Sequence, residues 1–355
     1  MNKIIFVLPP EKNIPFGGYK IVYEYANRLT SRGWEVSIGY DCRNVGKSFD
    51  IKMFRNSIVH FVSELRRICY PKWFCLSDRV RKFCIYDEKD IPVTDNIVAT
   101  AYETADLVAK MIEYNRLYLV QGYETWENRT EEEVNASFRL GMKNIVIAKW
   151  LKNIVDKSCD TDNSILISNG IDLTEFSLYN PIELRKEKKI SMLYHQSELK
   201  GSKYGIEVLK ELKKMYPELK AVLFGIPKRP CDLPDWIEYV QNATSKQLKK
   251  IYNESQIFLY PTIEEGFGLT CVESMACGCA LCATNYLGVH EFAIDGFNSL
   301  LSPTKNVKAM VDNACKLLDN DSLRIKLAVE GKKYVEIFDW EKAVNKFEEN
   351  LIKNN

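Results

Sequence analysis

Short apolar segments rich in β-branched and aromatic residues recur along the whole chain, with helix-like segments between them. Near-continuous apolar strands separated by helices are typical of parallel sheets that helices cover on both faces. The alternation therefore predicts an α/β protein with one doubly wound sheet in each half. The segments expected to form strands are 3–9, 35–40, 96–101, 116–122, 144–148, 164–169, 190–195, 220–225, 257–262, 279–284 and 298–303.

The length of 355 residues indicates two domains, because it exceeds what one ordinary hydrophobic core holds. The boundary is expected near 168–189, where a turn dipeptide, a proline and a run of charges precede renewed strand-like sequence. We predict a first domain over 1–167, a second over 168–336 and a final segment over 337–355.

An amphipathic helix is expected in the final segment, over 339–353. Its apolar residues fall on one stripe, and Asp339 is placed to cap its start. The stripe consists of Trp340, Val344, Phe347 and Leu351.

Charge and cysteine content restrict the partners and the compartment. The formal net charge is +1, so the overall charge gives no reason to expect nucleic acid or an acidic partner. The apolar run near the start is too short for a signal peptide, and no segment approaches the roughly 18 apolar residues of a membrane span. We therefore expect a cytoplasmic protein whose 11 cysteines stay reduced.

Two glycine-containing turns follow predicted strands. One holds Gly17 and Gly18, and the other holds Gly266 and Gly268. Glycine lets backbone N–H groups approach a phosphate at the start of a helix. A plain strand–helix turn is the alternative at the first of these sites. Because G-x-G-x-x-G is absent from this first turn, a nicotinamide cofactor is not expected.

Two acids flank the second turn. Glu265 precedes the predicted helix and Glu273 lies about two turns into it, so both can reach one extended ligand. Carboxylate oxygens accept hydrogen bonds from hydroxyl groups, which suits a sugar. The alternative is a solvated helix face, which the apolar surroundings disfavour.

Metal and redox sites are not predicted. The pair Cys279 and Cys282 has no second cysteine or histidine pair at zinc spacing, so core packing is the better interpretation. The acidic sequence 160–162 lies in a polar loop rather than at a strand end beside glycines. The three histidines do not cluster in the sequence.

The sequence PTIEEGFGLTCVESMACGCALCATNYLGVHEFAIDGFNSLL, over 261–301, resembles the donor-binding segment of glycosyltransferase family 4. Its marks are the E-x7-E pair, the Gly-Phe-Gly turn and the later G-V-H-E and D-G elements. ISNGIDLTEF (167–176) resembles the element that opens the second domain, and FDW (338–340) the start of the last helix, which crosses back onto the first domain. The resemblance implies a GT-B fold, in which two Rossmann-like doubly wound domains face each other across a cleft.

The resemblance implies roles for the residues that match. Glu265 would bind hydroxyls of the donor sugar, Glu273 would bind the ribose, and Lys200 would neutralise the leaving diphosphate. The other residues that it places around the donor are Gly17, Gly18, Gly225, Gly266, Phe267, Gly268 and Leu269.

The sequence departs from the family at two places. His195 stands where the family usually has an arginine, and an imidazole lacks the two-point grip of a guanidinium. Either His195 does a weaker version of this task, or Lys203 or Arg229 replaces it; surface charge is the alternative for both.

The second departure is LYLVQGYETW (117–126), where many members carry a histidine. It resembles a polysaccharide-assembly subgroup that includes rhamnosyltransferases. Gln121 is a catalytic candidate there, and Tyr123 and Glu124 are acceptor-side candidates. A strand end with buried aromatic residues is the alternative.

A basic segment over 52–82 predicts contact with an anionic membrane surface, because it combines a helical apolar stripe, aromatic residues and many cations. A helix packed on its own domain is the alternative. The cations are Lys52, Arg55, Arg66, Arg67, Lys72, Arg79, Arg81 and Lys82.

The resemblance implies a retaining, metal-independent hexosyl-type glycosyltransferase without a cofactor. It would move a sugar from a nucleotide-diphosphate sugar to a glycan or lipid-linked acceptor in cell-surface polysaccharide or glycoconjugate synthesis. The donor base stays open among UDP, dTDP and GDP. The alternatives are a catalytically weak sugar-nucleotide-binding subunit, for which His195 is the best support, and a sugar-nucleotide hydrolase or epimerase on the same fold.

Overall fold

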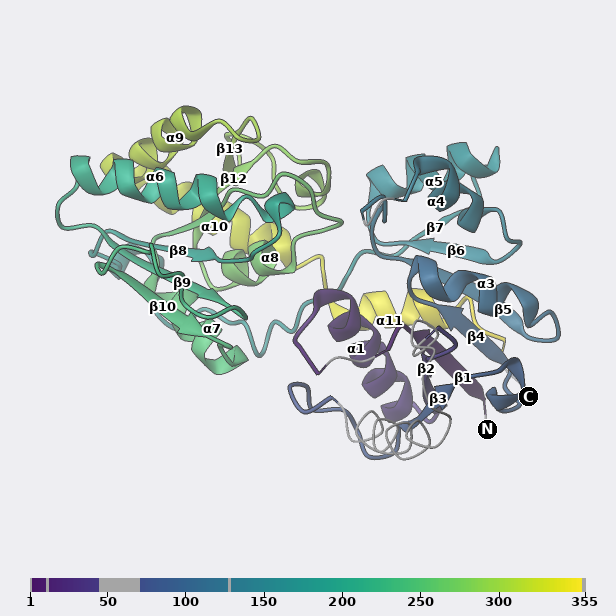
Figure 1. Ribbon diagram of the computed structural model, residues 1–355. Coiled ribbons are helices and arrows are strands. Elements are labelled where there is room, and N and C mark those ends of the chain that lie inside the picture. The colour runs from purple at the N-terminus through teal and green to yellow at the C-terminus, as the bar shows by residue number, and fades with distance from the viewer. Residues whose placement is uncertain (1, 11–12, 45–70, 127–128, 353–355) are drawn as a thin grey trace. The chain divides into compact units, whose positions relative to one another are not determined.

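The computed structural model describes residues 2–10, 13–44, 71–126 and 129–352. The chain forms two compact units, each with its own sheet (Figure 1). The first unit comprises Met1–Ser168 and Ala343–Asn355, and the second comprises Asn169–Lys342.

The first unit is built on a seven-stranded parallel sheet with the order β3-β2-β1-β4-β5-β6-β7. The strand order reverses between β1 and β4, and ligands of open α/β sheets bind beyond the carboxyl ends of strands at such a point. The strands are β1 (Lys3–Leu8), β2 (Glu35–Asp41), β3 (Arg81–Ile85), β4 (Asn96–Ala99), β5 (Asn115–Val120), β6 (Lys143–Val146) and β7 (Ile165–Leu166).

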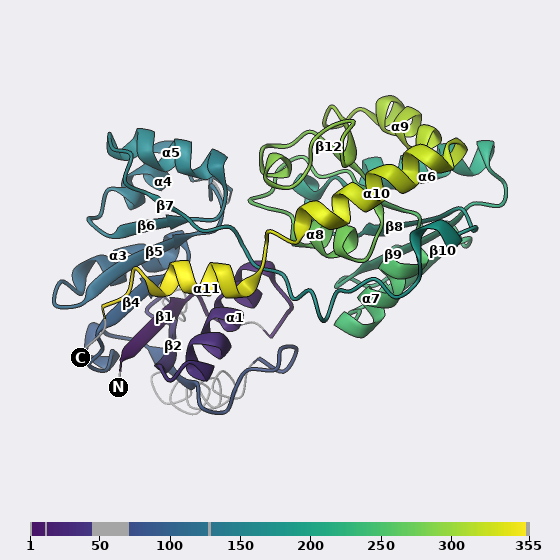
Figure 2. The ribbon, with the colours of Figure 1, turned by 180° about the vertical axis from the view of Figure 1, so that it is seen from behind.

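Among the described residues, helices follow β1, β3, β4, β5 and β6, and the last helix of the chain also packs on this sheet (Figure 2). In that helix, Phe347 stacks on Phe6 with ring centroids 6.0 Å apart and lies 4.5 Å from the ring of Tyr25. The stripe predicted from the sequence is buried, and Asp339 accepts a hydrogen bond from the backbone N–H of Glu341. The helices are α1 (Gly17–Ser31), η1 (Glu88–Asp90), α3 (Tyr102–Lys110), α4 (Glu131–Phe138), α5 (Lys149–Cys159) and α11 (Trp340–Glu348).

The second unit has a six-stranded parallel sheet with the order β10-β9-β8-β11-β12-β13. Its strands are β8 (Lys189–Leu193), β9 (Lys220–Gly225), β10 (Ile237–Gln241), β11 (Ile257–Tyr260), β12 (Ala280–Thr284) and β13 (Ser299–Ser302). Its helices are η2 (Ile182–Leu184), η3 (Glu198–Lys200), α6 (Ser202–Met215), α7 (Ser245–Glu254), α8 (Leu269–Ala276), η4 (Leu287–Glu291), α9 (Val307–Asp319) and α10 (Asp321–Val335). Apolar residues of β8, β9, β11, α6, α9 and α10 form one continuous core.

Arg185 joins the segment that enters the second unit to this core. Its side chain is buried, and its guanidinium donates hydrogen bonds to the backbone carbonyls of five residues. Such saturation offsets the cost of burying a charge without a carboxylate partner. The acceptors are the carbonyls of Asn180, Tyr252, Ser255, Cys277 and Gly278, at 2.5–3.3 Å.

The predicted fold class is confirmed, and every strand expected from the sequence overlaps an observed strand. Two further strands, β3 and β10, were not predicted. Both lie at the edge of a sheet and carry charged or polar residues among their apolar ones, as the sequences RKFCI and IEYVQ show. Edge strands are often charged, which weakens the apolar signal on which the prediction depended.

Most of the basic segment 52–82 lies outside the described residues. Of its members within them, Arg81 and Lys82 belong to β3. The rings of Trp73 and Phe74 pack 5.7 and 5.5 Å from that of Tyr23 in α1. In the part of the chain that the structure describes, no helix is both long and apolar enough to cross a membrane.

Candidate active site

Two loops of the second unit leave neighbouring strands at the same edge of the sheet. One follows β8 and carries His195 and Lys200; the other follows β11 and carries Glu265. Because β8 and β11 pair in parallel, their carboxyl ends lie side by side. The fold thus brings together three residues that are separated by up to 70 positions in the sequence.

Backbone contacts fix the two loops to each other. The carbonyl of Leu199 accepts hydrogen bonds from the N–H groups of Ile263 at 2.8 Å and Glu264 at 3.2 Å. Gly201 has φ of +62°, and a Cβ there would overlap the carbonyl oxygen of Pro261. Only glycine readily adopts this positive φ and also leaves room for the Pro261 carbonyl. The Lys-Gly pair therefore places Lys200 directly against the second loop.

Lys200 and Glu265 form an ion pair, with Lys200 Nζ 3.2 Å from Glu265 Oε2. The same oxygen accepts a hydrogen bond from the hydroxyl of Tyr260. Both charged side chains are about one-quarter exposed, at 24% and 23%. Within the described residues, Glu265 Oε1 accepts no hydrogen bond, and the closest approach of the Lys200 ammonium is to Oε2. The site therefore presents one accepting oxygen, beside an ammonium group.

His195 is a hydrogen-bond donor rather than a cation at neutral pH. Its Nδ1 accepts the backbone N–H of Ser197 at 2.9 Å, so a neutral ring carries its proton on Nε2. Its own backbone N–H donates to Ser202 Oγ at 2.8 Å. Burial lowers the pKa of the imidazole, and the nearby charge of Lys200 lowers it further. The ring can therefore donate one hydrogen bond, from Nε2.

Side-chain packing and one hydrogen bond hold the glycine turn that starts α8 in place. Gly268 has φ of +115°, and Tyr286 donates a hydrogen bond from its hydroxyl to the carbonyl of Phe267 at 3.0 Å. The buried ring of Phe267 packs against those of Phe292 and Phe338, so this residue offers a ligand its backbone rather than its side chain. A Cβ at Gly288 would lie 2.6 Å from the carbonyl oxygen of Glu265, so glycine is needed there too.

Sequence reasoning missed Tyr260, Tyr286 and Gly288. The signal for Tyr260 was weak, since the last residue of a buried strand ordinarily reads as core. Gly288 begins the G-V-H-E pattern noted over 288–301 but has no role of its own there, and Tyr286 lies just before that pattern.

The other residues predicted around the donor lie in varied settings. Glu273 is buried on α8, and Gly225 ends β9, where a Cβ would overlap the carbonyl oxygen of Tyr194.

Lys203, one of the two cations considered as a replacement for the arginine, is exposed and lies 3.6 Å from the carboxylate of Glu198. The guanidinium of Arg229 donates to carbonyls of its own loop and of the first residue of β10, and it forms no ion pair in the described structure. Those carbonyls belong to Leu233, Pro234 and Ile237.

The carboxyl edge of the first sheet brings together another part of the predicted set. A Cβ on Gly18 would lie 3.3 Å from Gln121 Nε2, which itself donates to the carbonyl of Thr100 at 3.2 Å. Glu124 accepts the backbone N–H of Tyr102 at 3.2 Å, and the Tyr123 hydroxyl donates to Asn135 Oδ1 at 3.2 Å. Gly17, the first residue of α1, lies at this edge too.

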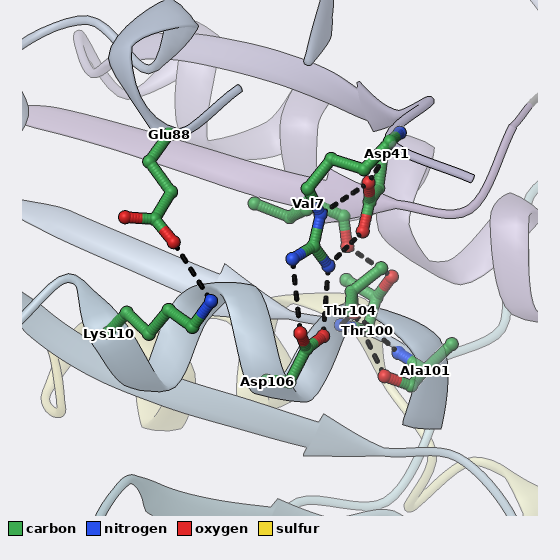
Figure 3. A network of polar contacts seen from close by, with 9 residues as sticks. Val7, Asp41, Glu88, Thr100, Ala101, Thr104, Asp106 and Lys110 are labelled. Atoms are coloured by element: carbon green, nitrogen blue, oxygen red, sulfur yellow. Dashed lines mark hydrogen bonds and ion pairs between the residues drawn. The ribbon is translucent and has the colours of Figure 1, made fainter. Parts of the chain in front are cut away.

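A polar network fixes the strand ends of this edge (Figure 3). Thr100 Oγ1 donates to the carbonyl of Val7 at 2.8 Å, which ties β4 to β1. Arg43, just after β2, binds the carboxylate of Asp41 at 2.7 Å and that of Asp106 on α3 at 2.9 Å. Hydrogen bonds and ion pairs therefore join the strand ends of the edge that carries Gly18 and Gln121.

The cysteines near the second turn are packing residues, as expected. Cys271, Cys277, Cys279 and Cys282 are all buried. Burial raises the pKa of Cys279 to about 11 and that of Cys282 to about 12, so both stay protonated thiols at neutral pH. Among the described residues, no group of three or more His, Cys, Asp or Glu side chains could hold a metal ion.

Part of the chain is similar in sequence to known proteins. Residues 179–334 match the family model "Glycosyl transferases group 1". An uncharacterized glycosyltransferase of Methanocaldococcus jannaschii is 27% identical over 57% of each chain. The capsular polysaccharide biosynthesis glycosyltransferase CapM of Staphylococcus aureus is 25% identical over 59% of this chain and 58% of its own. The chain thus spans just under three-fifths of the length of these two relatives.

One relative matches along nearly its full length. The lipopolysaccharide 1,2-N-acetylglucosaminetransferase of Salmonella typhimurium is 23% identical over 99% of this chain and 98% of its own.

Solved structures share the fold. The sucrose-phosphate synthase of Thermosynechococcus elongatus superposes with a TM-score of 0.76 at 15% identity, over 98% of both chains. HepE of Anabaena, solved with UDP and glucose, gives 0.73 at 14% identity, over 98% of this chain and 99% of its own. The chain has the GT-B fold, and the match over 179–334 includes the loops of Lys200 and Glu265. The matched residues 179–334 make up less than half of the chain and lie within its second unit.

Proposed function

We propose that the protein is a retaining glycosyltransferase of family 4, in the subgroup that includes rhamnosyltransferases. It moves a hexosyl group from a nucleotide-diphosphate sugar to a glycan or lipid-linked acceptor in cell-surface polysaccharide or glycoconjugate synthesis. The observation that carries the proposal is the Lys200–Glu265 pair beside the glycine turn that starts α8. The names of the capsular polysaccharide and lipopolysaccharide relatives support the acceptor class.

Each group at the site suits one part of such a donor. Glu265 Oε1 accepts a hydroxyl of the sugar, and Glu273 accepts the ribose. The backbone N–H groups from Gly266 to Leu269 and the positive end of the α8 dipole favour the diphosphate. Lys200 and the Nε2–H of His195 supply further donors to the diphosphate oxygens.

The chemistry follows from where charge develops. The bond between the anomeric carbon and the β-phosphate oxygen breaks, and negative charge collects on the departing diphosphate. Lys200 and the N-terminus of α8 stabilise that charge more in the transition state than in the ground state. The acceptor hydroxyl bonds to the anomeric carbon on the same face, and its proton passes to the departing phosphate oxygen. Protein groups supply the charge, so we propose a metal-independent reaction.

We propose that residues of the first unit bind the acceptor and also parts of the donor. Gly17 and Gly18 offer backbone N–H groups to the diphosphate, and Gln121 would face the donor sugar. Tyr123 and Glu124 would bind the acceptor. Their shared position at the carboxyl edge of the first sheet supports this proposal.

The test is a panel of UDP-, dTDP- and GDP-sugars, with and without a lipid-linked acceptor extracted from cells. We expect nucleoside diphosphate release that depends on the acceptor, and a product with the anomeric configuration of the donor by NMR. Release that needs no acceptor would favour a hydrolase instead, and tight donor binding without turnover would favour a binding subunit. An inverted product would contradict retention.

We also propose that the protein acts in the cytoplasm, at the inner face of the cell membrane. The sequence of 52–82 supports this, with its excess of cations, and a lipid-linked acceptor would lie there. Flotation of the full chain with vesicles tests it. Binding should need anionic lipid and weaken with salt; no binding to anionic vesicles at low salt would contradict it.

A further inference from the structure

Tyr260 is a buried tyrosine whose hydroxyl faces the candidate site. It ends β11 and is 2% exposed. Its ring lies 5.8 Å from that of Phe258 and 5.9 Å from that of Tyr286. In the described structure, Glu265 Oε2 is the hydrogen-bond partner of this hydroxyl. The strand thus fixes the ring, and the ring fixes the hydroxyl.

The two donors to Glu265 come from different elements and meet on one oxygen. Lys200 reaches Oε2 from η3, and Tyr260 reaches it from the end of β11. A carboxylate held by two donors keeps one orientation, and here the orientation leaves Oε1 for a ligand. Lys200 ends a flexible stem, whereas Tyr260 is locked by packing, so the tyrosine defines where the carboxylate lies.

Donor binding would place unequal demands on these two contacts. The diphosphate attracts the ammonium of Lys200, which must then divide its hydrogen bonds between phosphate and carboxylate. If Lys200 were the only anchor, Glu265 would follow the ammonium or lose its fixed place. The Tyr260 hydroxyl carries no charge, so a diphosphate does not draw it away.

We propose, on the basis of the function proposed above, that Tyr260 is a positioning residue for donor-sugar recognition. Its hydroxyl holds Glu265 so that Oε1 accepts a sugar hydroxyl, and it keeps Glu265 in place while Lys200 binds the diphosphate. A packing role would require only the ring of Tyr260. The hydroxyl is needed only if the carboxylate must be held.

The test separates these roles by calorimetric titration with two ligands: a nucleoside diphosphate and the matching nucleotide-sugar found by the donor panel. Tyr260→Phe keeps the ring and removes the hydroxyl. A hydrogen bond to a charged group corresponds to roughly tenfold in affinity or more. The variant should therefore bind the nucleotide-sugar about tenfold more weakly and bind the nucleoside diphosphate unchanged.

Tyr216→Phe is the matched control. The Tyr216 hydroxyl also donates to a carboxylate, that of Asp319, at 2.7 Å. It follows the far end of α6, about 20 Å along the helix from Lys200. Both affinities should be unchanged in this variant.

A double-mutant cycle gives the second readout. With Glu265→Ala present, Tyr260→Phe should have no further effect on either ligand, because the carboxylate that it positions is gone. Three results would each overturn the inference. Tyr260→Phe could weaken binding of both ligands equally, or leave both affinities unchanged. It could also weaken nucleotide-sugar binding as much in the Glu265→Ala protein as in the wild type. Wild-type protein that binds none of the panel would instead overturn the proposed function, and this inference with it.

Discussion

Arg185 and Lys200 are two cations of the second unit that are satisfied in opposite ways. The buried guanidinium of Arg185 donates to the carbonyls of five residues. The ammonium of Lys200 meets one carboxylate and is one-quarter exposed. A cation whose donors are all used holds a fold together, whereas one with donors to spare can bind a ligand. We therefore expect Arg185 to serve stability and, under the proposed function, Lys200 to serve binding and turnover of the donor.

The largest expected effect is on activity, in Lys200→Met. The change removes the charge that faces the departing diphosphate and keeps a side chain of similar length. Loss of one such group costs roughly 10²–10³-fold in kcat. The free energy of unfolding should fall by less than about 1 kcal/mol, because the ion pair is partly exposed. Transfer assays and urea unfolding check both parts; near-normal turnover would remove Lys200 from the site.

The same substitution at Arg185 should give the reverse result. Arg185→Met leaves several buried carbonyls without their donor, and the free energy of unfolding should drop by about 3 kcal/mol or more. The kcat of the molecules that remain folded should match the wild type. Urea unfolding and active-site titration by donor binding measure the two quantities. A variant with wild-type stability and reduced kcat would break the contrast between the two cations.

A smaller effect concerns His195 and pH. Its pKa is lowered in the folded state, so the unfolded chain binds more protons below the usual histidine value of about 6.5. The stability from the neutral ring is thus complete above about pH 6.5 and declines as pH falls from there toward the lowered pKa. His195→Asn should lack this decline in urea unfolding between about pH 7.5 and 5. Parallel pH profiles for the two proteins would contradict a half-buried, neutral His195.

His195→Arg tests whether residue 195 lies beside the bound diphosphate. An added guanidinium can bind the diphosphate at two points, so affinity for the nucleoside diphosphate should rise about tenfold. His195→Gln, which has no charge, is the control and should not show the increase. Weaker binding by the arginine variant would mean that the loop has no room for a diphosphate beside residue 195.

The sequence predicted the sheets well because central strands of parallel sheets are apolar almost throughout. It missed β3 and β10 because edge strands mix charges into that pattern. For the site, the motif located Glu265 and Lys200, and parallel pairing of β8 and β11 explains why they meet. Neither the tautomer of His195 nor the hydroxyl of Tyr260 had a sequence signal, because both depend on contacts made only after folding.

The central claim is that Lys200 and Glu265 bind different parts of one nucleotide-sugar. Calorimetric titration of the wild type, Lys200→Met and Glu265→Ala, each with a nucleoside diphosphate and with the matching nucleotide-sugar, tests it most directly. Lys200→Met should weaken binding of both ligands, whereas Glu265→Ala should weaken only that of the nucleotide-sugar. Unchanged binding of both ligands by Lys200→Met, or equal losses of both by Glu265→Ala, would contradict the claim.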